Sequence, residues 1–353
     1  MAPKPNKADR YPILDALRFV LAFWVVMAHF GPPPLFFAVS ENTQVGSILA
    51  RGWRTIPFGT AAVIGFFVIS GFCIHLPFRD DRSLPIGRYY ARRYTRILIP
   101  LAGALFCLWF AGIPIHFLGQ GSILWSPSVL WSLLCEEIYY AIYPLLRVVR
   151  CWLGWTPLLS AAFALGSGIA LTHRYASDWV DCGPLGTAFI LLPIWLLGAL
   201  LAEQVEHLTP LKSMATIWQW RFGVWAASWV CEMLHFKVHV SYTQTMIPFG
   251  VLAFLWIRQE IRYGMFKSPW TRLVSAGGWS YSLYLIHGPA MYTFAKRIPV
   301  PNLGVVGNWC AAYTFILTLS YVFYRLVEKP SHRLAREISL RTTEKTRVLE
   351  QTA

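Results

Sequence analysis

Long apolar segments recur along the whole chain, separated by short polar or basic loops. Ten of them reach the length of about 17 to 25 residues that a helix needs to span a bilayer. They are residues 12–30, 57–77, 97–115, 124–146, 153–172, 184–202, 214–231, 241–257, 272–294 and 304–326. Only helices and closed barrels satisfy their backbone hydrogen bonds in lipid, and segments this uniformly apolar do not alternate as barrel strands do. The pattern predicts an all-α, polytopic integral-membrane bundle of about ten transmembrane helices.

Composition and charge support a membrane protein. Hydrophobic residues make up 56% of the chain and charged residues only 14%, whereas soluble domains carry about 25% charged residues. The net charge of +14 would suit nucleic acid, but the basic residues lie in blocks between the apolar segments. Such blocks set membrane orientation, so we expect no nucleic-acid partner and contact with membrane lipids instead. Their alternation places both termini in the cytoplasm, with a membrane domain at residues 1–330 and a charged cytoplasmic tail at 331–353.

The first apolar segment carries two ionisable residues, Arg18 and His29. Such side chains are costly in hydrocarbon and usually face an interior cavity. A helix rises about 1.5 Å per residue, which separates them by roughly 16 Å on nearly the same face. A cation at the entrance and a base farther in would suit a long anionic substrate whose reactive end enters first. The alternative is that both side chains only snorkel to the interfaces.

Two neighbouring stretches add candidates for binding such a substrate. GFFVISGFCIH contains Ser70 and Gly71, which could form a tight passage for a substrate chain or simply allow close helix contact. GRYYARRYTRILIP carries arginines at helical spacing, among them Arg92, Arg93 and Arg96. Arginine's planar fork suits phosphate, although a cluster facing anionic lipid headgroups would look the same.

Polar residues also interrupt two later segments. Glu136 and Glu137 fall within an apolar and aromatic stretch, and adjacent helical residues point about 100° apart, so we expect Glu136 alone to face the cavity. A buried carboxylate must be neutral or paired, and we expect its partner to be His29 or Arg18. Near the other end of the chain, His287 and Tyr281 could contact a hydroxyl-rich acceptor. His287 could equally be a histidine at a helix end before a proline.

Other chemistries find little support in the sequence. Glu232, His235 and His239 have a spacing that could bind a metal, but no fourth ligand is near, so we expect no metal site. Glycine-rich nucleotide-binding loops and the GxSxG elbow do not occur, which argues against nucleotide hydrolysis and against a hydrolase of that type. The seven cysteines form no CxxC pair.

Six short stretches, taken in order, carry a family resemblance. They are LDALR followed by His29, then FFVISGF, RRYTRI, WSLLCEEIYYAIYP, SYSLYLIH and VEKP, and they run from Leu14 to Pro330. In this order and spacing they resemble the acyltransferase-3 family, which includes bacterial membrane enzymes that acylate surface polysaccharides, Nod factors or macrolides.

The resemblance implies a function and roles for these residues. It implies acyl-CoA (acetyl-CoA above all) as cytoplasmic co-substrate with no bound cofactor, an essential pair matched by Arg18 and His29, and a donor-binding pair matched by Arg93 and Arg96. We therefore expect an O-acetyltransferase of the bacterial inner membrane, acting on a sugar hydroxyl of a surface glycan or lipid-linked sugar. Predicted catalytic residues are His29 and Glu136; predicted donor contacts are Arg18, Arg93, Arg96, Ser70 and Gly71; predicted acceptor contacts are His287 and Tyr281. His29 could act as a general base or be acylated itself. A transporter or flippase for a lipid-linked sugar, or an acyltransferase for a small natural product, are the alternatives.

Overall fold

Helices account for nearly all of the residues that the computed structural model describes, which are 11–34, 46–47, 50, 52–53, 55, 58–112, 130–176, 179–298 and 303–338. No strand occurs in this part of the chain. The long helices are α1 (Pro12–Phe30), α3 (Gly59–His75), α4 (Ile86–Phe110), α5 (Leu130–Leu153), α6 (Trp155–Thr172), α7 (Gly183–Gln204), α8 (Met214–Val238), α9 (Tyr242–Phe266), α11 (Ser280–Arg297) and α12 (Gly304–Phe323), and α10 (Thr271–Gly277) is short. Each predicted segment overlaps one of the long helices. The predicted residues 113–115 and 124–129 lie outside the described part, as does the tail beyond 338.

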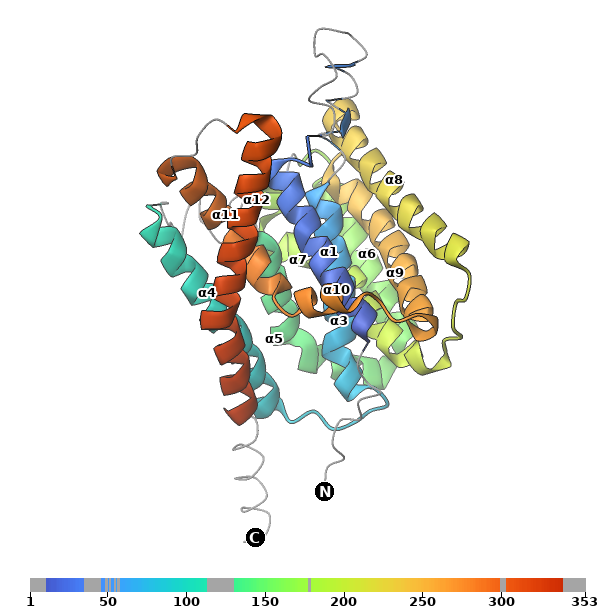
Figure 1. Cartoon of the computed structure of the whole chain (residues 1–353). Helices are drawn as coiled ribbons and strands as arrows, with labels where there is room; N and C mark the ends of the chain where they lie inside the picture. Colours follow the sequence, from blue (N-terminus) through green and yellow to red (C-terminus); the bar gives the residue numbers. More distant parts are fainter. Residues whose placement is uncertain are drawn as a thin grey trace.

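Six of the described helical stretches are long and apolar enough to cross a membrane. They are Pro12–Phe30, Gly59–Phe78, Ile86–Phe110, Trp155–Thr172, Gly183–His207 and Gly304–Ile338. The chain is therefore an all-α membrane protein, while ten crossings and cytoplasmic termini stay predictions. The start of α1 and the C-terminal end of α12 lie at the same end of the bundle (Figure 1).

Two predicted segments have different boundaries in the structure. α4 begins at Ile86 rather than residue 97, because its arginine-rich first turns are helical although too polar for a hydropathy window. The predicted segment 272–294 is divided into α10 and α11. A Cβ on Gly277 would lie 2.0 Å from the backbone oxygen of Asp15, so the chain meets α1 there and ends one helix before starting the next.

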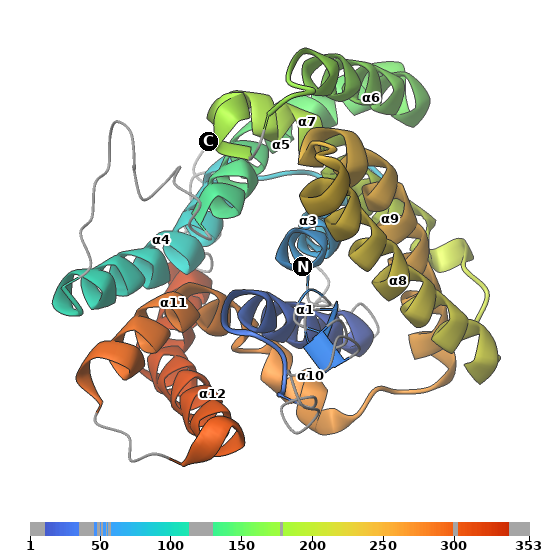
Figure 2. The ribbon, with the colours of Figure 1, turned by 90° about the horizontal axis from the view of Figure 1, so that it is seen from above.

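The centre of the bundle is the crossing of α3 and α7. A Cβ on Gly71 would lie 1.9 Å from the Trp195 backbone oxygen, and one on Gly198 would lie 2.0 Å from the Val68 oxygen. The two backbones therefore touch through a pair of glycines, as small residues allow in membrane helices. Figure 2 shows α3 beside α1, with α9 on one side and α5 on the other.

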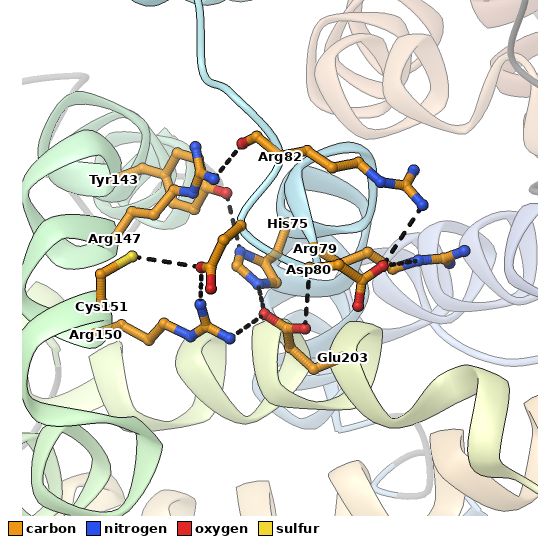
Figure 3. Close-up of polar contacts among 10 residues, drawn as sticks. His75, Arg79, Asp80, Arg82, Tyr143, Arg147, Arg150, Cys151 and Glu203 are labelled. Carbon is orange, nitrogen blue, oxygen red and sulfur yellow. Dashed lines mark hydrogen bonds and ion pairs between the residues drawn. The ribbon is translucent and has the colours of Figure 1, made fainter. Parts of the chain in front are cut away.

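A polar cluster joins the ends of α3, α5 and α7 (Figure 3). His75 is buried, and its Nε2 donates to Glu203 Oε1 at 2.8 Å while its Nδ1 contacts the Tyr143 hydroxyl at 2.9 Å. Arg150 Nη2 donates to the same Glu203 oxygen at 2.8 Å, and Arg150 also pairs with Asp81 in the loop after α3. These contacts satisfy one another, so the cluster fixes three helix ends and the loop that leads to α4.

Arg221, which interrupts the predicted seventh segment, binds a carboxylate on the next helix. Its Nε and Nη2 donate to Glu260 at 2.6 and 2.8 Å, a two-point pairing between α8 and α9. Glu260 is fully buried and also accepts from Trp256 Nε1 at 2.9 Å. A charged pair with additional hydrogen bonds can remain inside an apolar bundle, which explains why α8 tolerates an arginine.

Replacing Arg221 with methionine should therefore destabilise the α8–α9 pair. Removing one partner of a buried pair typically costs about 3–5 kcal/mol, and we expect the lower end because the arginine side chain is 31% exposed. The measurement is the Tm of the purified protein in detergent. The matched double variant Arg221→Met, Glu260→Leu should recover part of the loss. A single variant as stable as the wild type would contradict this account.

Candidate active site

A cavity of about 380 Å³ lies between α1, α3, α4, α5, α11 and the end of α12. Its charged wall residues are three arginines and three carboxylates: Arg18, Arg93, Arg96, Asp15, Glu136 and Glu328. Ser70 and Tyr281 also line it. The structure thus brings together most of the predicted site residues, from segments far apart in the sequence.

The arginines of the cavity come from two helices. Arg93 and Arg96 lie on α4, three residues apart, and Arg18 lies on α1. Asp15 is the ion-pair neighbour of Arg18 at 3.9 Å, and Arg93 lies 5.9 Å from the centre of the Tyr140 ring. Like charges held close together favour an anion between them, and guanidinium groups match phosphate geometry. Arg92 is not among the residues that line the cavity.

Glu136 belongs to a network of hydroxyl groups rather than to a pair with His29. It interacts with the Ser70 and Tyr140 hydroxyls and electrostatically with Arg18. Ser70 Oγ lies 2.9 Å from the Tyr140 hydroxyl. Of the two expected partners, Arg18 is near enough to act on Glu136 electrostatically, whereas His29 lies in the last turn of α1 and contacts His287 instead. Glu137 is not among the residues that line the cavity.

Gly71 has a different place from the one predicted. It contacts the α7 backbone at Trp195, and it does not line the cavity that Ser70 lines. Of the two readings of this stretch, donor contact and close helix packing, the structure places Gly71 in the second. Ser70 and Gly71 are adjacent in one helix and therefore point about 100° apart, so they face different neighbours.

His29 contacts a second histidine. Its Nδ1 lies 3.1 Å from Nε2 of His287, and the two rings stack with centroids 5.1 Å apart. His287 Nδ1 in turn donates to the Leu283 backbone oxygen at 3.2 Å. Only 1% of His287 is exposed. His287 is therefore the buried neighbour of His29, and its contact with an acceptor stays a prediction.

Two tyrosines of α11, Tyr281 and Tyr284, line the cavity. Tyr281, a predicted acceptor contact, lines the same cavity as the arginines, and its hydroxyl donates to the Ile97 backbone oxygen at 3.3 Å. Tyr284 also lines the cavity, and its hydroxyl is 2.6 Å from Ser132 Oγ on α5. Its ring lies 6.1 Å from that of His287. Tyr284 thus connects the cavity wall with the histidine pair.

Several cavity residues escaped the sequence analysis. Glu328, in the π-helical turn Tyr324–Glu328 that follows α12, accepts from the Ser282 backbone nitrogen at 3.0 Å and lies 3.6 Å from His332. Its signal was a carboxylate ending an apolar segment, in the stretch YRLVEKP. Ser132 and Tyr284 gave no such signal, because isolated hydroxyl groups are common in membrane helices.

The described residues contain no group of three or more potential metal ligands. Of the three residues with a suggestive spacing, His235 stacks on Tyr242 with ring centroids 3.6 Å apart. Its Nδ1 lies 3.1 Å from the Val240 backbone oxygen. This histidine is thus engaged in local packing at the end of α8.

Comparison with known proteins gives one match. A family described as an acyltransferase domain, Acyl_transf_3, matches residues 11–325. No curated protein and no solved structure matches the chain significantly. The match covers the helices that build the cavity and both histidines, and the chain belongs to the acyltransferase-3 family.

Proposed function

We propose that this protein is a membrane-bound O-acyltransferase that moves an acetyl group from cytoplasmic acetyl-CoA to a sugar hydroxyl of a surface or exported glycan. Family membership supports acyl transfer in a membrane. The observation that carries the donor assignment is the cavity, because three arginines face one space beside a hydroxyl network. The proposed location is the bacterial inner membrane, where donor and acceptor would lie on opposite sides.

The donor would bind with its phosphates toward Arg93 and Arg96. Arginine forks bind phosphate through paired hydrogen bonds. The thioester arm would extend along the wall that Ser70 and Tyr140 form, with Arg18 held in place by Asp15 and Glu136. In this proposal Glu136 holds the cavity residues in place and does not orient the base, His29.

The reaction would take place at His29. In the general-base route, its imidazole takes the proton of the sugar hydroxyl while the oxygen attacks the thioester carbonyl. The carbon–sulfur bond then breaks, and the CoA sulfur leaves with the proton that His29 returns. Ester and free CoA thiol are the products, and His29 ends in its starting state. In the covalent route the same nitrogen carries the acetyl group between the two substrates.

The test of this function is donor turnover by the purified protein. With acetyl-CoA and a cell-envelope glycan fraction, we expect release of free CoA together with new O-acetyl groups, detected by mass spectrometry. Surface glycans from cells with and without the gene should differ by the same groups. Transport of a lipid-linked sugar without any CoA release would favour the flippase alternative.

Replacing Arg93 and Arg96 with alanine, singly, should weaken acetyl-CoA binding. Each loses a charge-assisted contact that is typically worth about 1.5–3 kcal/mol, equivalent to roughly 10- to 150-fold in Kd. Calorimetric titration with acetyl-CoA gives this Kd directly. Arg258→Ala, on α9 and away from the cavity, is the matched control and should bind normally. Unchanged affinity in both cavity variants would favour a lipid-headgroup role for these arginines.

A further inference from the structure

The histidine pair contains a chain of hydrogen bonds with a fixed direction. It begins at the Leu283 backbone oxygen, passes through Nδ1 and Nε2 of His287, and reaches Nδ1 of His29, whose ring also hydrogen-bonds to the backbone at Val25. A backbone carbonyl can only accept a hydrogen bond. His287 Nδ1 must therefore carry a hydrogen.

The neutral state of His287 determines the next bond. Its side chain is buried between the rings of Phe30 and Tyr284, whose centroids lie 5.8 and 6.1 Å away. Neither histidine forms an ion pair with a carboxylate among the described residues. A buried imidazolium without a carboxylate would be costly, so the ring is neutral and its Nε2 can only accept.

It follows that the hydrogen between the rings belongs to His29. His29 Nδ1 donates to His287 Nε2 across 3.1 Å. The remaining nitrogen of a neutral His29 ring, Nε2, then carries the lone pair. This assignment follows because a neutral imidazole has one donor and one acceptor nitrogen. Nε2 is the ring nitrogen of His29 that does not take part in the hydrogen bond to His287.

We propose that His287 is a positioning residue that selects the reactive tautomer of His29. Its significance for catalysis rests on the proposed function. Both proposed routes need a lone pair on the outward nitrogen, one to take the hydroxyl proton and the other to attack the thioester. An aspartate or glutamate normally performs this task for a catalytic histidine. Here a neutral imidazole performs it, and the Leu283 carbonyl fixes that imidazole in turn.

The most direct test reads the tautomer itself. The protein labelled with ¹⁵N-histidine, in detergent at neutral pH, should show His29 protonated at Nδ1 and unprotonated at Nε2. The two ring systems are assigned by the signals lost in His29→Gln and His287→Gln. Hydrogen on Nε2 of His29, or a doubly protonated His287, would overturn the proposal. This result does not depend on which reaction the protein catalyses.

The second test compares two replacements of His287. Glutamine places an amide oxygen near the position of Nε2 and keeps an acceptor for His29, whereas leucine fills space without one. We expect His287→Leu to lower kcat for CoA release about 100-fold, within the range for a lost general base, with KM for acetyl-CoA within about threefold. His287→Gln should retain activity within about tenfold of the wild type.

A matched control isolates the role of the pair. His235 also places its Nδ1 near a backbone oxygen, that of Val240, but does so on α8 away from His29. His235→Leu should leave kcat unchanged. Full activity of His287→Leu, or equal losses in the leucine and glutamine variants, would overturn the positioning role. An inactive wild type would instead contradict the proposed function, and the NMR result would still decide the tautomer.

Discussion

Replacing His29 with alanine is expected to lower acyl transfer by about 10²- to 10⁴-fold, the usual loss when a general base is removed. The variant should still fold, because His29 lies in the last turn of α1 and its side-chain partner, His287, keeps its own bond to Leu283. The measurement is CoA release from acetyl-CoA together with O-acetyl groups on the glycan.

Acetyl-CoA binding is the companion measurement for this variant. We expect the Kd of His29→Ala to stay near that of the wild type, since His29 does not line the arginine cavity. His173→Ala, at the end of α6, provides a histidine control. Transfer above a few per cent of wild type in a folded His29→Ala protein would exclude both proposed roles. A radiolabelled acetyl group transferred from acetyl-CoA to the wild-type protein but not to the variant, with release of CoA and no acceptor present, would select the covalent route.

Replacing Gly71 or Gly198 with leucine is expected to prevent assembly of the bundle. Even a Cβ at these positions would lie within 2.0 Å of a backbone oxygen on the partner helix, so the helices α3 and α7 would have to separate. Overpacking a core usually costs about 1–3 kcal/mol and sometimes more, and here backbone must move rather than a flexible side chain. The measurement is the fraction of monodisperse protein in size-exclusion chromatography, with Tm for any that folds.

A glycine in open space is the control for this effect. A Cβ on Gly223 of α8 would meet nothing within 4 Å. Gly223→Ala should therefore fold normally and gain up to about 1 kcal/mol from the better helix propensity of alanine. Should Gly71→Leu and Gly198→Leu behave like this control, the close crossing of α3 and α7 would be wrong.

Hydrophobic pattern was sufficient to predict the helices but not all of their ends. The length of an apolar segment reflects how much of a helix contacts lipid or core. It therefore predicted the bounds of α1, α3 and α7 to within about two residues. It placed the start of α4 too late because arginines that face a cavity look like a loop to a hydropathy window. It also joined α10 to α11, since a break caused by contact with another helix leaves no mark in composition.

The sequence predicted which residues belong to the candidate site but not which of them contact one another. Helical spacing predicted that Arg18 and His29 share a face and that Glu136 and Glu137 point apart, whereas the choice of Arg93 with Arg96 came from the family resemblance. The sequence left the partner of Glu136 open between His29 and Arg18, because spacing within one helix says nothing about which helix lies opposite. His29 and His287 are 258 positions apart in sequence, and only the packing of α1 on α11 brings them together.

The α3–α7 crossing limits how the Ser70 side of the cavity can move. Ser70 lies on a helix whose backbone is locked against its neighbour at the very next residue, Gly71. Tyr284 lines the same cavity from α11, and its hydroxyl is 2.6 Å from Ser132 Oγ on α5. Five residues later Pro289 removes a backbone donor from α11 and so interrupts its hydrogen-bond ladder. If the donor binds as proposed, its thioester arm would rest against a Ser70 wall that cannot separate from α7, and any opening of the cavity toward His29 would fall to α11.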